Sequence, residues 1–136
     1  MTQLEFINLM IGKPWANRAD SVDEVDCYGL VKLYKNMVDG IELPQATGYK
    51  EGFAFTSIWR RETKRVWWQV GKWTDGAMVT FYDNSMQAVH IGICVGNQQV
   101  LHARGSESVG GKVEIHSISV LEKAYKAVSF HEVING

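Results

Sequence analysis

Cysteine, proline and long apolar runs are scarce in this 136-residue sequence, and the scarcity excludes several classes of protein. The two cysteines, Cys27 and Cys94, can form one disulfide bond or none, so they cannot build a disulfide scaffold or a four-cysteine zinc site. No apolar run approaches the roughly 20 residues of a membrane-spanning helix. The N-terminus lacks the basic and apolar regions of a secretory signal, so we expect synthesis in the cytoplasm without a signal peptide.

Net charge is also nearly absent, because 14 lysines and arginines offset 15 acidic residues to leave −1. That balance provides no overall field to attract nucleic acid or an anionic membrane. Apolar residues make up 46% of the chain, which is enough for a folded core. The length suits a single domain covering residues 1–136.

The order of predicted elements is helices first and strands afterwards. Thr2 is expected to cap a helix that ends at Met10, and Asp26 to cap a second helix with an apolar stripe of helical spacing. A noisier pattern predicts a further helix over about 53–69. Strands are expected over 77–82, 88–95, 99–103, 112–117 and 127–133, with a short helical piece near 120–123. This order is typical of an α+β fold with an antiparallel sheet.

Cys27 is expected in the first turn of the second helix, where a thiol can become reactive. Unpaired backbone N–H groups and the positive end of the helix dipole stabilise a thiolate there, and can stabilise an oxyanion on a substrate carbonyl. Gly29 has no side chain, so another segment can approach this turn closely. The alternative is that the cysteine is only a small buried apolar residue, which is how we interpret Cys94.

The register of one predicted hairpin decides whether two histidines meet. Along the strand before the turn, His90 and Gly92 point to the same face. A three-residue loop pairs Val95 with Gln99, and therefore Gly92 with His102, which makes the two histidines diagonal neighbours on one face. A two-residue loop would put them on opposite faces.

Cys27, His90 and His102 together supply the groups of a Cys–His–His triad. A free thiol is only slightly ionised near neutral pH, so it needs a histidine to take its proton and later protonate the leaving amine. A third group fixes the tautomer of that histidine. His116 and His131 have no comparable neighbours in the sequence pattern, and we interpret both as structural or exposed.

Three segments in order resemble the NlpC-type family of cell-wall cysteine peptidases: Asp26 to Val31, His90 to Gly96, and Val100 to Ala103. The resemblance extends from about Ile11 to Ala103. It implies a papain-like α+β core, with the nucleophile's helix packed on a central antiparallel sheet. It also implies cleavage of the D-γ-glutamyl–diaminopimelate bond in peptidoglycan stem peptides, with no cofactor.

By position, the resemblance implies Cys27 as the nucleophile, His90 as the general base and His102 as the orienting residue. Asp26 stands where some relatives contact the amine of the peptide substrate. Trp15 takes the place of a tyrosine that supports the oxyanion site in the family's Gly-x-Pro-Tyr segment.

Tyr28 stands where the family commonly has serine. This departure, the Pro14–Trp15 pair and the segment from Gly40 to Pro44 resemble the phage tail-tip branch. That branch implies a virion-associated protein that the particle carries to the bacterial cell wall, with other tail proteins as partners.

Three alternatives stay open. Cys27, His90 and His102 are also suitable zinc ligands. The chain could instead be a catalytically weak or inactive tail-assembly module of the same fold. The same triad could also perform acyl transfer or act on another amide.

Tryptophans and basic residues gather over residues 59–73: Trp59, Arg60, Arg61, Lys64, Arg65, Trp67, Trp68 and Trp73. Basic residues with interleaved aromatics can bind single-stranded nucleic acid. We favour an amphipathic helix with buried tryptophans and solvated charges, and expect no nucleic-acid partner because the overall charge is near zero. A docking surface for another tail protein or for glycan is the second interpretation.

Overall fold

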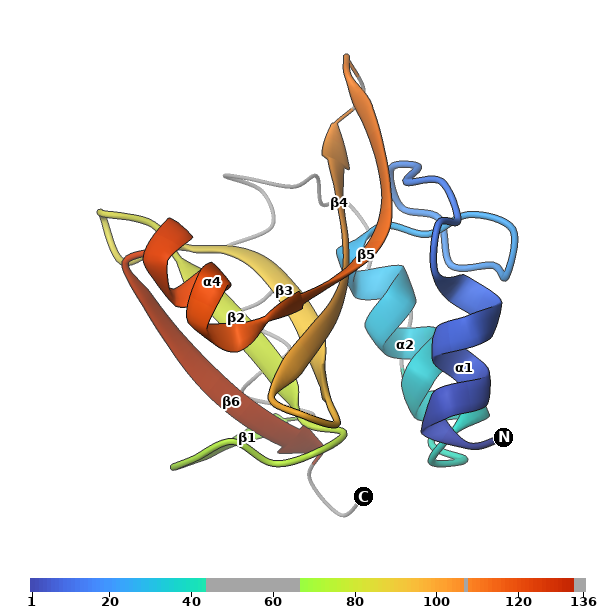
Figure 1. Cartoon of the computed structure of the whole chain (residues 1–136), viewed down its shortest axis with the longest axis horizontal. Coiled ribbons are helices and arrows are strands. Elements are labelled where there is room, and N and C mark those ends of the chain that lie inside the picture. The colour runs from blue at the N-terminus through green and yellow to red at the C-terminus, as the bar shows by residue number, and fades with distance from the viewer. Residues whose placement is uncertain (44–66, 107, 134–136) are drawn as a thin grey trace.

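An antiparallel sheet runs through the centre of the molecule (Figure 1). The structure is a computed structural model that describes residues 1–43, 67–106 and 108–133. Within these ranges the strand order is β1-β6-β2-β3-β4-β5. The strands are β1 (Trp67–Val70), β2 (Met78–Tyr82), β3 (Ala88–Val95), β4 (Gln99–Ser106), β5 (Gly110–Ser117) and β6 (Ala127–Val133).

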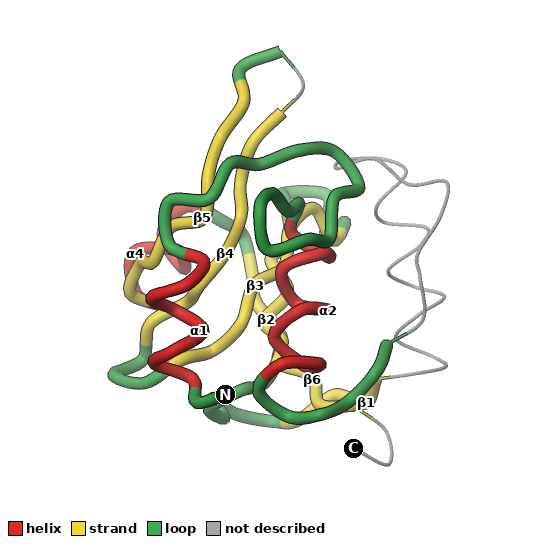
Figure 2. Tube along the Cα trace, turned by 90° about the vertical axis from the view of Figure 1, so that its right-hand side faces the viewer, coloured by secondary structure: helices red, strands yellow, loops and turns green. Residues whose placement is uncertain are grey.

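The predicted α+β class, with N-terminal helices packed on an antiparallel sheet, is confirmed, and a further helix covers the other face. The helices α1 (Gln3–Met10) and α2 (Cys27–Met37) lie side by side on one face, and α4 (Ile118–Ala124) lies on the other (Figures 1 and 2). Each face has its own cluster of buried apolar residues. Cys94 belongs to the cluster beneath α4 and is fully buried, which confirms its interpretation as a packing residue.

The starts of α1 and α2 follow from their capping residues. Thr2 accepts a hydrogen bond from the Glu5 backbone N–H, and the Glu5 side chain accepts one from the Thr2 backbone N–H. At α2 the cap is a single bond, in which the Asp26 side chain accepts from the Gly29 backbone N–H. These capping bonds satisfy N–H groups that a helix start leaves without intrahelical partners, so both predicted helix starts are confirmed.

Lys35 anchors the far end of α2 and is only 2% exposed. Its Nζ donates to the Gly76 carbonyl oxygen at 2.7 Å and lies 3.2 Å from Asp39 Oδ2 and 3.5 Å from Glu132 Oε1. A buried ammonium group requires such partners. Because Glu132 belongs to β6, these contacts join α2 to the sheet.

The predicted helix over 53–69 is wrong at its C-terminal end. Trp67 to Gln69 lie in β1, which pairs antiparallel with β6 from Trp67↔Val133 to Val70↔Phe130. The remainder of that prediction, with most of the basic and aromatic stretch, lies outside the described residues. No helix in the described ranges has the length and apolar character that a membrane crossing requires.

Candidate active site

Cys27 is the first residue of α2 and is fully buried. The carboxylate of Asp26 organises this helix start, since Oδ1 accepts from the Gly29 N–H at 2.8 Å and Oδ2 from the Arg18 N–H at 2.9 Å. Asp26 is itself fully buried. Its two oxygens therefore hold the helix start and the preceding loop together, while the substrate contact implied by the resemblance stays a prediction.

The loop before α2 presses directly on the first helical turn. A Cβ atom on Gly29 would overlap the Ala19 carbonyl oxygen, so the side chain of any other residue would push this loop away. The predicted close approach at Gly29 is confirmed. Lys32 also holds the loop, through a 2.8 Å ion pair with Asp20.

His90 and His102 meet on one face of the β3–β4 hairpin. The register pairs Val95 with Gln99, so the loop has three residues, and the predicted register is confirmed. His90 Nε2 lies 2.9 Å from His102 Nδ1, within hydrogen-bond distance. The position of Gly92 makes this possible, because a Cβ there would lie 3.0 Å from His102 Cβ.

His116 extends the pair to a row of three imidazoles, so its interpretation as a histidine without such neighbours is wrong. His102 Nε2 lies 2.8 Å from His116 Nδ1. The β4–β5 register pairs Val100 with His116 and makes the two histidines diagonal neighbours. The Gly110–Gly111 pair could have signalled this turn, but the register depends on the loop length.

Both proposed catalytic histidines are neutral at rest. Burial lowers the pKa of His90 well below its usual value, and the nearby His102 and Arg104 lower it further. Burial also lowers the pKa of His102 to about 3, with further contributions from His116 and Arg104. A neutral imidazole has one nitrogen that donates and one that accepts, so the row can orient its protons in one direction.

Trp15 and Tyr28 are both buried beside these elements, at 8% and 7% exposure. The backbone N–H of Trp15 donates to the Gly111 carbonyl oxygen at 2.9 Å. Its side chain fills the space over Gly105, where a Cβ would lie 2.8 Å from Trp15 Cγ. Trp15 therefore packs under the β4–β5 hairpin, and its role at an oxyanion site stays a prediction.

The fold brings the strands of the two histidines against the helix of the cysteine. The helix α2 packs on β3 and β4 (Figure 2). Cys27 belongs to the core cluster on the α2 face, while the His90 ring stacks on Phe81, whose cluster lies beneath α4, with 5.8 Å between the ring centroids. The described geometry thus joins His90 to His102, and places Cys27 at the start of the adjacent helix.

A sequence profile of the NlpC/P60 family matches residues 12–134 of this chain. The chain belongs to the NlpC/P60 family. The match covers most of the chain, including the start of α2 and all six strands. The family suggests a cysteine peptidase that acts on the bacterial cell wall. A search of curated proteins found no match.

Solved NlpC/P60 structures share this fold at low sequence identity. The NlpC/p60 domain of the peptidoglycan hydrolase SagA is 17% identical, with a TM-score of 0.60, over 96% of this chain and 95% of that chain. NlpC2 from Trichomonas vaginalis is 18% identical, with a TM-score of 0.62, over 94% of this chain. This chain spans only 43% of the length of NlpC2. The assignment to the phage tail-tip branch stays a prediction.

Proposed function

We propose that this NlpC/P60 chain is a cysteine peptidase that hydrolyses amide bonds in peptidoglycan stem peptides. Cys27 is the nucleophile, His90 the general base and His102 the residue that orients His90. The observation that carries the proposal is the 2.9 Å contact between His90 Nε2 and His102 Nδ1. It supplies the base and its orienting partner, beside a helix that begins with a cysteine.

The reaction proceeds in two steps that return the enzyme to its starting state. His90 takes the proton of the Cys27 thiol, and the sulfur attacks the amide carbonyl carbon. The C–N bond then breaks, and His90 gives the proton to the leaving amine. Water, deprotonated by His90, hydrolyses the thioester to a carboxylic acid and the free thiol.

Two features of the chain suit it to this reaction, one stabilising the oxyanion and the other orienting the base. Backbone N–H groups at the start of α2 are suited to stabilise the oxyanion. His102 accepts the Nε2–H of His90 at its Nδ1, which leaves His90 Nδ1 to receive the thiol proton. This proton arrangement is assigned from the roles of the groups.

The test compares wild type with Cys27→Ala on purified muropeptides, with products identified by mass spectrometry. We expect fragments only from wild type. The matched control is Cys94→Ala, which removes the other buried cysteine and should retain hydrolysis per folded molecule. If Cys27→Ala releases the same fragments as wild type, the proposal is wrong.

We further propose the D-γ-glutamyl–diaminopimelate bond as the one cleaved, and a phage tail as the vehicle that carries the chain to the wall. The resemblance of the Pro14–Trp15 pair and Tyr28 to the tail-tip branch supports the second part. Synthetic stem peptides test the bond, since cleavage at another amide would contradict it. An antibody against this chain should label purified particles, and particles without label would contradict the tail assignment.

A further inference from the structure

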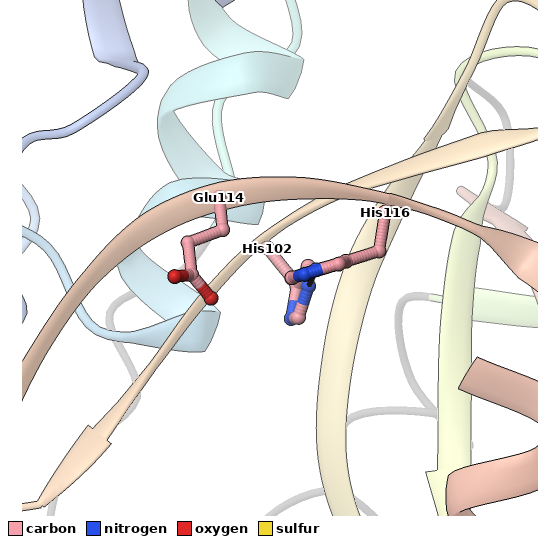
Figure 3. Close-up of side chains that lie close together, drawn as sticks. All are labelled: His102, Glu114 and His116. Carbon is pink, nitrogen blue, oxygen red and sulfur yellow. Dashed lines mark hydrogen bonds between the residues drawn. The ribbon is translucent and has the colours of Figure 1, made fainter. Parts of the chain in front are cut away.

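Three side chains with metal-binding atoms converge on the β4–β5 face: His102, Glu114 and His116 (Figure 3). The register pairs His102 with Glu114 and Val100 with His116. Because side chains alternate along a strand, the three point to the same face. One potential ligand atom from each residue lies within 4.8 Å of the other two.

The spacing is close to that of an occupied site. Two nitrogens bound to zinc at ~2.0–2.1 Å with tetrahedral angles lie roughly 3.3 Å apart. His102 Nε2 and His116 Nδ1 are now 2.8 Å apart, so an ion would open this contact by about 0.5 Å. Glu114 and His116 are half-buried, so small side-chain rotations suffice.

The residues around the three side chains orient the His102 ring on one side and leave Glu114 and His116 open to the surface on the other. His90 Nε2 contacts Nδ1 of His102 and so orients the ring with its Nε2 toward Glu114 and His116, as a hydrogen bond to the other ring nitrogen does for metal-bound histidines. Glu114 and His116 also line a surface cavity of about 280 Å³. Water can therefore reach Glu114 and His116 from this side.

We propose that His102 Nε2, Glu114 and His116 Nδ1 bind one divalent transition-metal ion, with zinc the best match, and that the bound ion inhibits the peptidase. Two imidazoles and a carboxylate with one open position form a known type of zinc site. The positive charges of Arg104 and its strand neighbour Lys112 oppose a cation here, and the carboxylate of Glu114 offsets one of them. The zinc alternative considered from the sequence, with Cys27 and His90, shares only His102 with this site.

Inhibition follows from the direction of one hydrogen bond, and this part rests on the proposed function. In the peptidase, His102 Nδ1 accepts the N–H of His90. A metal ion takes the lone pair of His102 Nε2, so the ring proton must reside on Nδ1. His102 then donates to His90 instead of accepting from it, and His90 no longer has the proton arrangement that the thiol requires.

Zinc titration measured by calorimetry tests the site without relying on activity. We expect wild type and Cys27→Ala to bind one zinc ion per chain with equal affinity. Glu114→Gln, which preserves the shape of the side chain, and His116→Ala should each bind zinc at least about tenfold more weakly, since even the loss of a hydrogen-bond partner of a metal ligand costs that much. Circular dichroism checks that each variant is folded, and Co²⁺ in place of zinc should give the visible spectrum of a tetrahedral ion.

Three other results of the zinc titration would overturn the proposed metal site. Wild type that binds no zinc contradicts it directly, and loss of binding in Cys27→Ala assigns the ion to the thiol. Affinity that does not change in Glu114→Gln and His116→Ala places the ion elsewhere.

Hydrolysis of muropeptides tests the regulatory part separately. Zinc should stop wild-type hydrolysis, whereas Glu114→Gln should cleave at the wild-type rate without metal and should resist zinc at the same concentration. Equal inhibition of both proteins would show that zinc acts through another site. If metal-free wild type hydrolyses nothing, the proposed function fails, and the calorimetric result still decides whether the metal site exists.

Discussion

Adding one methyl group at Gly92 tests whether the packing between β3 and β4 holds His102 in place. A Cβ there would lie 2.6 Å from Val100 Cγ1 and 3.0 Å from both His102 Cβ and the Leu101 carbonyl oxygen. Non-bonded carbon atoms prefer roughly 3.5–4.0 Å, so Val100 must move away by about 1 Å and His102 by about 0.5 Å. We expect Gly92→Ala to lower the free energy of unfolding by about 1–3 kcal/mol, the range for overpacked cores.

Catalysis should suffer in addition to stability. A displacement of His102 by about 0.5 Å lengthens its contact with His90, and we expect kcat to fall by about tenfold, since a full 1 Å misplacement costs about 100-fold. The matched control is Gly96→Ala, because a Cβ there meets nothing closer than Gln3 Oε1 at 3.7 Å. This control should unfold within about 0.5 kcal/mol of wild type, as substitutions away from packing features do, and keep its activity.

Urea denaturation followed by tryptophan fluorescence measures both variants, and muropeptide hydrolysis is expressed per folded molecule. If Gly92→Ala unfolds at the same urea concentration as Gly96→Ala, the close packing at Gly92 is wrong. If stability falls but hydrolysis does not, the position of His102 does not limit the reaction.

Three further predictions concern the thiols, a helix cap and pH. Iodoacetamide should label Cys27 faster than Cys94 near neutral pH, because burial raises the pKa of the Cys94 thiol to about 12; equal, slow rates would contradict an activated Cys27. Asp26→Ala should lower the free energy of unfolding, measured by urea denaturation, by about 1–2 kcal/mol, and Asp26→Asn should lower it less. Thr2→Ala should also destabilise the protein but should not reduce hydrolysis. Equal losses of stability from both Asp26 variants would contradict the capping role of Asp26. Burial lowers the pKa of His131, so as pH falls below about 6.5 the unfolded chain takes up a proton that the folded chain does not, and the free energy of unfolding decreases. His131→Gln should reduce this decrease between pH 7 and 5. An unchanged slope of the free energy of unfolding against pH would refute the assignment to His131.

Local sequence signals predict those features that depend on residues close together in the chain. Thr2 and Asp26 predict the helix starts because each cap bonds to a backbone N–H three residues ahead. The three-residue loop after Val95 predicts the contact of His90 with His102 because a hairpin register follows from its loop length.

Features that depend on distant partners could not be predicted in this way. Trp67 lies in a strand because it pairs with Val133 at the opposite end of the described chain, and no local pattern contains that partner. The position of His116 beside His102 depends on where the β4–β5 hairpin turns. An error of one residue in that turn would put His116 on the other face.

The burial of Lys35 makes this side chain an indicator of whether α2 remains attached to the sheet. Reagents that acylate lysine amines reach Lys123, which is exposed on α4, in the native protein. Lys35 is held by its contacts with Gly76 and Glu132 and is 2% exposed, so the reagent can reach its amine only when α2 separates from β6. The ratio of acylation at these two lysines, measured by mass spectrometry, therefore gives the opening rate of the helix that carries Cys27.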